Sequence, residues 1–492
     1  MDQSFGIHWF RRDLRVAGNR GLSKNWKRNK GRVVGLFCFD KKFLGREDFS
    51  VHRFQFFMET LKELQSELRE MGSDLFFIDV GPEVGFDKIL KDLPNPPSLI
   101  TWGQDYEPYA RARDKKMQDF FKSKNIETFV ARDHLLIEPH ELGKKDRPDE
   151  TYQVYSPFAR RWLDLFQDDS IQKRVQQERA GIEYLKSRLN KKCEIRFNLT
   201  WADLLPDFPD PTKVLQSYLI ENRKRVKINL PKAGSLQAFQ ELQSFTKRLD
   251  HYQSKRDIPS VKGTSGFSIF LKNGSLTIPQ IIYYLKLQAY KKKSSSQDSF
   301  FSELIWREFY YHILYHHPHV ETQSFLSQYE NLRWENNNTW FEAWKSGQTG
   351  FPIVDAGMRQ LQETGWMHNR VRMIVASFLT KDLLIDWRWG EKYFMETLLD
   401  GDLAPNNGGW QWAASTGCDP QPYFRIFNPW SQSSKFDPKG EYIKSYLPEL
   451  ADLSPKELHA PVLGNKNYPE PIVDHKEQRL KALEIYKATR KS

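Results

Sequence analysis

Phe5-Gly6-Ile7-His8-Trp9-Phe10 is an apolar run of strand length, and the charged run Arg11-Arg12-Asp13-Leu14-Arg15 follows it directly. Further apolar runs recur between residues 32 and 130, separated by stretches with the three- and four-residue spacing of amphipathic helices. This alternation predicts an α/β fold, a parallel doubly wound sheet with helices on its faces. The later runs that we interpret as strands are Arg32–Phe39, Leu75–Val80, Leu99–Trp102 and Ile126–Val130.

The sequence pattern changes twice along the chain, after residue 131 and after residue 205. We place the α/β domain at residues 1–131, because residues 132–205 lose the regular pattern and contain scattered prolines and charges. We interpret 132–205 as a connector, closed by the proline-rich segment 206–211, in which a charged helix over 173–189 is the one regular element considered. Residues 206–492 show helical spacing and are predicted to form a larger all-α domain, with helices near 214–220, 237–249, 278–290, 301–315, 367–384 and 391–399.

The composition excludes several classes of protein. The 492 residues carry a net charge of +11 and include 34 Phe, 20 Tyr and 15 Trp, too many aromatic residues for a disordered chain. Cys38, Cys193 and Cys418 form no CxxC pair, so we expect no metal site. No GxGxxG follows the first strand, which excludes a standard dinucleotide-binding turn. The positive charge suits a polyanionic partner and a well-solvated basic enzyme equally well.

The sequence also indicates where the protein resides. Its N-terminus carries an acid and no apolar core of signal-peptide length. Its apolar runs stay below the ~20 residues that cross a bilayer. We therefore expect a soluble protein with no membrane partner. The three scattered cysteines suit the reducing cytoplasm, and we expect a monomer.

The segment Glu303–Tyr310 is the first candidate site. On a helix, Glu303, Trp306, Arg307 and Tyr310 share one face, where a carboxylate, an indole and a guanidinium are able to grip a planar ligand. From the spacing alone, a structural helix with an internal Glu303–Arg307 pair and a core Trp is the favoured interpretation.

Three further segments combine residue types that suit a ligand. In 367–374, Asn369, Arg372 and Met373 lie together beside an apolar face, which indicates a polar pocket or solvated surface about equally. The segment 400–412 combines two acids, a double Asn and a double Gly with two Trp, and we interpret it as a loop whose backbone approaches a ligand. The small and hydroxyl-rich 262–268 precedes helical sequence and suits a phosphate group or a plain helix cap.

Together these segments resemble the DNA photolyase/cryptochrome family, and within it the class I cyclobutane pyrimidine dimer photolyases. The resemblance extends from Trp9–Arg15 to Tyr468–Asp474, and its most specific stretches are Trp306–Tyr310, Met367–Met373, Asn406–Trp412 and Tyr423–Pro429. It implies an N-terminal α/β domain, a connector and a helical domain that holds FAD, in agreement with the pattern above. It also implies light-dependent repair by electron transfer from photoexcited reduced FAD to a flipped-out dimer in damaged DNA.

The resemblance assigns the cofactor residues by motif. Asn406 falls beside flavin N5, where a neutral amide is the photolyase pattern and plant cryptochromes typically have Asp. Arg372 is expected to pair with Asp400. The residues that match FAD contacts are Tyr252, Thr264, Ser265, Gly266, Phe267, Ser268, Arg372, Asp400, Gly401, Asp402 and Asn406.

It assigns the DNA and electron-transfer residues in the same way. Glu303 is expected to hydrogen-bond the lesion, and photolyases for the other main lesion carry histidines where this chain has Asn369 and Met373. Residues that match contacts to the dimer or to DNA near it are Arg256, Glu303, Trp306, Arg307, Asn369, Arg370, Met373, Trp412 and Gln432. The relay that photoreduces the flavin from the surface matches Trp410, Trp387 and Trp334.

The sequence departs from the family pattern at positions where other members bind a second chromophore. Members that bind methenyltetrahydrofolate have Asn-Glu where this chain has Tyr109-Ala110, and Cys-Lys where it has Val320-Glu321. Another antenna chromophore, or none, stays open. A cryptochrome-type photoreceptor is the main alternative function, and a flavin-free protein that stacks single-stranded DNA on its aromatic residues is a third.

Overall fold

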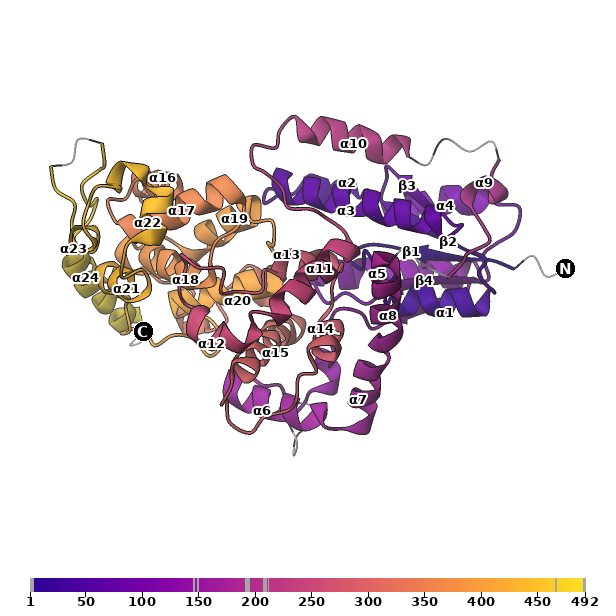
Figure 1. The fold of residues 1–492 in the computed structure, drawn as a ribbon, viewed down its shortest axis with the longest axis horizontal. Coiled ribbons are helices and arrows are strands. Elements are labelled where there is room, and N and C mark those ends of the chain that lie inside the picture. Colours follow the sequence, from indigo (N-terminus) through magenta and orange to yellow (C-terminus); the bar gives the residue numbers. More distant parts are fainter. Residues whose placement is uncertain are drawn as a thin grey trace.

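In the computed structural model, which describes residues 4–489 apart from 145–146, 148–149, 191–194, 207–209, 211 and 465–466, the first part of the chain is an α/β domain. Its five parallel strands lie in the order β3-β2-β1-β4-β5. They are β1 Gly6–Trp9, β2 Val33–Cys38, β3 Leu75–Ile78, β4 Leu99–Gly103 and β5 Thr128–Ala131. The predicted sheet is confirmed, and Figure 1 shows it at the end of the molecule that carries the N-terminus.

Helices cover both faces of the sheet because the side chains of each strand alternate between the faces. Val33 and Leu75 belong to one buried cluster with residues of α1 (Arg20–Arg28) and α3 (Val51–Glu70). Ile7 and Trp102 belong to another with residues of α4 (Pro82–Asp92) and α5 (Pro108–Ser123). The short α2 (Lys41–Leu44) follows β2, and α10 (Lys213–Arg223) packs on α3 although it comes after the connector in sequence.

The connector is more ordered than predicted. It contains α6 (Tyr155–Phe166), α7 (Asp169–Gln176) and α8 (Glu178–Leu189), followed by α9 (Trp201–Leu204). The charged helix considered over 173–189 is present as the end of α7 and as α8, whereas α6 and α9 were not predicted. Pro157 lies in the first turn of α6, where proline is tolerated, so it does not break the helix. Glu308 fixes this region to the helical domain by accepting from the Trp162 indole at 2.6 Å and the Leu136 amide at 2.6 Å. Cys193 and part of the segment 206–211 lie outside the described residues.

The rest of the described chain is helical, as predicted, and in Figure 1 its later helices, α16, α17 and α21–α24, form the end of the molecule away from the N-terminus. None of the described helices combines the length and the apolar character that crossing a membrane requires. The helices are α11 (Ser235–Thr246), α12 (Tyr252–Lys255), α13 (Ser268–Asn273), α14 (Ile278–Leu285), α15 (Ser296–His316), α16 (Asn338–Ser346), α17 (Pro352–Thr364), α18 (Asn369–Ser377), α19 (Trp387–Thr397), α20 (Leu403–Ala414), α21 (Pro429–Phe436), α22 (Glu441–Tyr446), α23 (Pro455–Leu458) and α24 (His475–Thr489).

Two predicted elements differ in the structure. The helix expected over 367–384 begins only at Asn369, where His368 caps it, and continues as a π-helix over Phe378–Asp382. The loop expected over 400–412 is wrong beyond Asp402, because Leu403–Ala414 is helix α20. A Cβ on Gly408 would overlap the Tyr310 ring. Glycine therefore serves close packing of α20 on α15 there, and not a flexible turn.

The α/β domain docks on the C-terminal end of α13. Leu14 N–H donates to the Asn273 carbonyl at 3.1 Å, and the Arg15 guanidinium donates to the Gly274 carbonyl at 3.0 Å. Gly274 has a φ of +76°, and a Cβ at this position would overlap the Arg12 carbonyl oxygen. A side chain here would push the two parts of the molecule apart.

Gly274→Ala should therefore lower the free energy of unfolding by about 2 kcal/mol or more, since backbone strain and a clash at the junction add together. Urea denaturation measures the change. Gly464→Ala is the matched control, because Gly464 has a φ of +69° and a Cβ there would meet nothing within 4 Å. Equal losses in the two variants would show that the junction tolerates a side chain.

Candidate functional site

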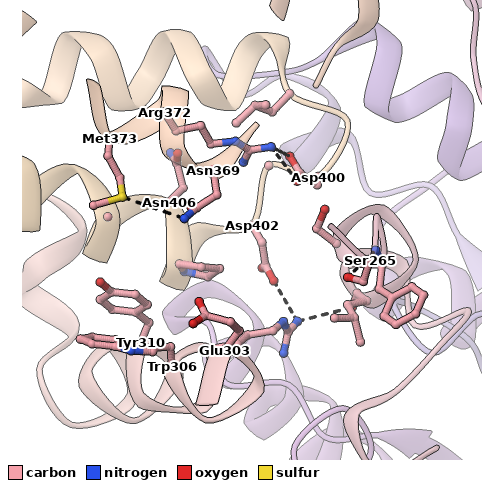
Figure 2. Close-up of a pocket in the computed structure, with 18 of the residues that line it drawn as sticks. Ser265, Glu303, Trp306, Tyr310, Asn369, Arg372, Met373, Asp400, Asp402 and Asn406 are labelled. Carbon is pink, nitrogen blue, oxygen red and sulfur yellow. Dashed lines mark hydrogen bonds and ion pairs between the residues drawn. The ribbon is translucent and has the colours of Figure 1, made fainter. Parts of the chain in front are cut away.

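A cavity of about 530 Å³ opens between α13, α15, α18 and α20 (Figure 2). Four segments that are far apart in sequence meet here, and most of the predicted site residues line it. These are Tyr252, Arg256, Ser265, Phe267, Ser268, Glu303, Trp306, Arg307, Asn369, Arg370, Arg372, Met373, Asp400, Gly401, Asp402, Asn406, Trp410 and Trp412.

Five predicted site residues lie off the cavity lining. Thr264 and Gly266 flank Ser265, and Gln432 is half-buried on α21. Trp387 is fully buried in a hydrophobic cluster that also holds Trp410, and Trp334 packs against the same cluster from a half-buried position. The three tryptophans predicted to form the relay thus share one apolar region, and Trp410 also lines the cavity.

The pairing predicted for Arg372 is present. Its guanidinium donates to both carboxylate oxygens of Asp400, at 2.9 and 3.1 Å, and to the Met367 carbonyl at 2.8 Å. Arg372 comes from α18 and Asp400 from the segment before α20, so the pair fixes two walls of the cavity relative to each other (Figure 2). The pair has no net charge and forms one hydrogen-bonded edge of the cavity.

Asp402 is the centre of a larger buried network. Its carboxylate accepts from Lys272 at 3.0 Å, from Arg307 at 3.0 Å, from Arg12 at 3.3 Å and from the Tyr311 hydroxyl at 2.7 Å. Burial alone would raise the pKa of Asp402, but the three cations and the hydroxyl hold that pKa well below its usual range. The carboxylate is therefore ionised throughout the physiological pH range.

This network revises one expectation about Arg307. The internal Glu303–Arg307 pair is wrong, because Arg307 pairs with Asp402 and Glu303 accepts from Arg256 at 2.5 Å. Arg307 is only 11% exposed and also lines the cavity, and its predicted contact with DNA stays a prediction. Arg256 and Arg370 are more accessible, at 21% and 18%, and Arg370 pairs with Asp257 at 2.9 Å.

Asn406 is fixed on the first turn of α20. Its amide nitrogen donates to the Glu391 carbonyl at 3.1 Å, which sets the plane of the amide at the cavity. Burial raises the pKa of the Glu391 side chain to about 8. The negative charges of Asp48 and Glu321 raise the pKa of the Glu391 carboxyl further. The neutral amide of Asn406 lines the cavity.

The cavity has the features of a site for a large, partly anionic cofactor. Hypothetical Cβ atoms on Gly266 and Gly409 would meet nothing within 4 Å, so space is left at both. Arg307 Nη1 is buried without a hydrogen-bond partner. One part of the lining offers Ser265 and Ser268 at the start of α13, and another offers the aromatic rings of Trp306, Trp410 and Trp412. These residues fit FAD.

A second, smaller cavity of about 170 Å³ lies at the carboxyl ends of β1, β2 and β4. The strand order reverses between β1 and β4, which is the position where open parallel sheets bind ligands. Tyr109 donates a hydrogen bond to Asp40 there. The apolar part of the lining includes Phe37, Phe39, Phe43, Phe49, Phe54, Phe56 and Phe57.

The two cavities share a wall. Leu271 of α13 lines the first cavity, whereas Lys272 on the same helix lines the second and bonds Asp402 across the wall. Sequence reasoning missed this arrangement, although the charged run at Arg11–Arg15 marked the end of β1, where a ligand is expected.

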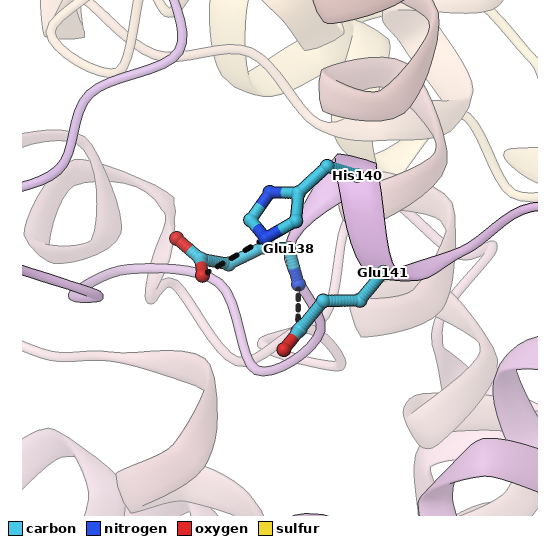
Figure 3. Close-up of side chains that lie close together, drawn as sticks. All are labelled: Glu138, His140 and Glu141. Carbon is cyan, nitrogen blue, oxygen red and sulfur yellow. Dashed lines mark hydrogen bonds and ion pairs between the residues drawn. The ribbon is translucent and has the colours of Figure 1, made fainter.

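A cluster of Glu138, His140 and Glu141 in the connector also brings potential metal ligands within 4.8 Å of one another (Figure 3). Its carboxylates already have partners. Glu138 accepts from the Tyr106 hydroxyl at 2.9 Å, and Glu141 accepts from both terminal nitrogens of Arg174 at 2.5 and 2.6 Å. We therefore interpret the cluster as structural.

Comparisons with known proteins agree with this geometry. The family model for DNA photolyase matches residues 6–178, and the model for the FAD binding domain of DNA photolyase matches residues 300–488. The deoxyribodipyrimidine photo-lyase of Escherichia coli is 36% identical over 98% of both chains. That of Synechococcus sp. is 38% identical over 97% of this chain and 96% of that protein.

Solved structures are similar over the full length. A bacterial class III photolyase from Agrobacterium tumefaciens has a TM-score of 0.84 at 31% identity and covers 100% of this chain and 99% of its own. An archaeal photolyase from Sulfolobus tokodaii, solved with two FAD molecules, has a TM-score of 0.76 at 31% identity and covers 98% of this chain and 99% of its own.

Asp402→Asn should lower the free energy of unfolding by about 3 kcal/mol, because it removes a buried anion shared by three partly buried cations. Arg12 and Lys272 keep Glu107 at 3.0 and 3.1 Å, whereas Arg307 loses the carboxylate with which it pairs. The folded pKa of Asp402 lies below its unfolded value of about 4, so its contribution is present above that pH and is lost as acid protonates the carboxylate. The stability difference from wild type should thus be constant between about pH 6 and 8 and shrink below about pH 4. Urea denaturation across this pH range measures it.

Asp87→Asn is the control, because the ion pairs that Asp87 forms with Lys91 and Lys124 lie at the surface. Its effect should stay within about 0.5 kcal/mol. A loss at Asp402 no larger than at Asp87 would contradict the central role of the buried network.

Proposed function

The chain belongs to the DNA photolyase family, and on this basis we propose that it is a deoxyribodipyrimidine photo-lyase that repairs cyclobutane pyrimidine dimers in DNA with light. The observation that carries the proposal is one cavity that brings the Arg372–Asp400 pair and Asn406 together with Glu303 and Trp306. Cofactor-holding and lesion-holding groups thus meet without an intervening wall. We keep the class I assignment within this proposal.

FAD is the cofactor that this cavity would hold. We propose that Tyr252 and the segment Thr264–Ser268 contact its phosphate and ribityl parts, where Gly266 leaves room for a close backbone approach. Arg372, Asp400, Gly401 and Asp402 would contact the ring system. When bound and reduced, FAD supplies one electron on absorbing light and recovers it after the ring has split, so repair needs no net oxidant.

The role of Asn406 is to present a neutral amide to the flavin. Its amide plane is fixed by the Glu391 carbonyl, so the group is oriented before the cofactor arrives. An aspartate here would place a negative charge against a reduced, anionic ring. The neutral side chain therefore favours the reduced state that repair requires.

The lesion would bind at the mouth of the same cavity. Extruding a base costs a few kcal/mol, and less at a damaged site, while stacking on an aromatic ring contributes about 1–3 kcal/mol per base. We propose that Trp306 and Trp412 provide this stacking, with Asn369 and Met373 beside them. We propose that Glu303 donates a hydrogen bond from its protonated carboxyl group to the lesion and thereby stabilises the added negative charge. Arg256, Arg370 and Gln432 would contact the flanking DNA.

We place an antenna chromophore in the second cavity. Its position at the switch point of the sheet suits a planar ligand, and the Sulfolobus tokodaii photolyase was solved with two FAD molecules, interpreted as evidence for a novel light-harvesting cofactor. Tyr109 and Asp40 would bind its polar groups. The sequence argument against methenyltetrahydrofolate stands within this proposal.

We further propose that the protein works as a monomer in the cytoplasm. One chain contains the full set of proposed cofactor and lesion contacts, so a second copy adds nothing that the reaction needs. A cryptochrome-type photoreceptor would share the flavin but not the repair activity, and a flavin-free DNA-binding protein would be colourless when purified.

The first test is repair itself. Reduced protein illuminated with dimer-containing DNA should restore free thymines, whereas the dark reaction should not. Absence of light-dependent recovery from flavin-loaded protein would eliminate the photolyase assignment and favour the photoreceptor.

Glu303→Ala should split fewer dimers per absorbed photon, because a hydrogen bond to a charged group is worth about 1.5–3 kcal/mol and the added electron loses that stabilisation. Thymine recovery per bound lesion measures the effect, and flavin content should stay near wild type. Glu342→Ala, at a 68%-exposed carboxylate on α16, is the control. Loss of flavin in Glu303→Ala would assign this residue to the cofactor instead.

Trp387→Phe should block reduction of oxidised flavin by light and an external reductant, and leave repair by chemically reduced protein near wild type. Flavin absorbance during illumination follows the first reaction, and thymine recovery follows the second. Trp389→Phe on the same helix is the control. Equal photoreduction in the two variants would exclude Trp387 from the relay.

A further inference from the structure

One aromatic residue of the connector lies directly behind Trp306. Tyr155, the first residue of α6, stacks on the indole with ring centroids 3.6 Å apart and planes inclined by 6°. Trp306 lines the large cavity, whereas Tyr155 does not and is only 8% exposed. Tyr155 therefore covers the side of Trp306 that faces away from the cavity.

Tyr155 is itself held at three points. Its hydroxyl hydrogen-bonds Ser302 Oγ at 2.7 Å and donates to the Ser302 carbonyl at 3.0 Å, one turn before Trp306 on α15. Its backbone N–H donates to Asp419 Oδ2 at 3.0 Å. Phe309 meets its ring edge-on, with centroids 5.8 Å apart. The tyrosine ring is thus a fixed surface against which the indole rests.

The contact with Asp419 adds a second connection. Asp419 lies in the segment that follows α20, the helix that carries Trp412. Tyr155 therefore contacts both α15, which carries Trp306, and the segment after α20, which carries Trp412. Both indoles line the cavity in which the lesion is proposed to bind.

We infer that Tyr155 is a positioning residue for lesion binding, which holds the Trp306 indole in the orientation that stacks on a flipped-out base. The inference rests on the proposed function. An unsupported indole would lose rotamer freedom when a base stacks on it, and that loss would subtract from affinity. With Tyr155 behind it, the ring is ordered before DNA arrives.

Removing the ring should weaken binding of the lesion selectively. Tyr155→Leu is expected to raise the Kd for dimer-containing DNA by about two- to tenfold, the range given by an aromatic pair and one ordered side chain. Tyr155→Met fills the same space without a flat ring and should show the same loss. Tyr155→Phe keeps the ring and should bind like wild type. Affinity for undamaged DNA, its salt dependence and flavin content should not change in any variant.

A double-mutant cycle tests whether Tyr155 acts through Trp306. In a Trp306→Ala background, Tyr155→Leu should cause no further loss of lesion affinity, because the group that it positions is gone. Phe158→Leu is the matched control on α6, since Phe158 packs on Phe309 and His312 at centroid distances of 5.0 and 5.2 Å. An equal loss in Phe158→Leu, or full additivity in the cycle, would overturn the inference and leave Tyr155 a general packing residue.

The two proposals fail in distinguishable ways. If wild-type protein does not prefer dimer-containing DNA over undamaged DNA, the proposed function fails. If wild type shows that preference and Tyr155→Leu and Tyr155→Met retain it in full, only the positioning role of Tyr155 is overturned.

Discussion

Asp402 holds a negative charge away from water, and the junction of the molecule depends on how that charge is compensated. Removing an ion from water costs several kcal/mol, which only well-placed partners offset. Those partners come from three places, namely Arg12 after β1, Lys272 on α13 and Arg307 on α15. Of the three, Arg12 is the partner that comes from the α/β domain, so its contact with Asp402 ties that domain to the helical domain, in which Lys272 and Arg307 already surround the carboxylate.

The same network explains why the two cavities lie so near each other. Lys272 reaches from the wall of the second cavity to Asp402 in the first, and α13 contributes residues to both linings. A chromophore in the second cavity would consequently be held at a fixed separation and orientation from the flavin. Rigid separation suits transfer of excitation energy, and a mobile domain boundary would not provide it.

The roles that we propose for the tryptophans differ because their surroundings differ. Trp306 and Trp412 line the cavity, where we propose that a base stacks on them, and Tyr155 stacks on Trp306. Trp410 lies between the cavity and the apolar cluster that contains Trp387, so its ring connects the proposed flavin site to the protein interior. The connector also contributes to the proposed lesion site, because Tyr155 of α6 stacks on Trp306.

The sequence by itself determined the α/β and helical domains, the family and most of the cavity residues, because periodicity and local motifs are properties of contiguous chain. It failed where a contact joins distant segments. Gly408 and Gly409 suggested a loop, whereas the structure has a helix in which the Tyr310 ring leaves no room for a Cβ on Gly408. Arg307 was paired with its neighbour Glu303 by spacing, whereas it pairs with Asp402. Only the tertiary structure decided that Arg12 meets Asp402 across 390 residues, since burial and charge balance act between elements and leave no periodic trace along the chain.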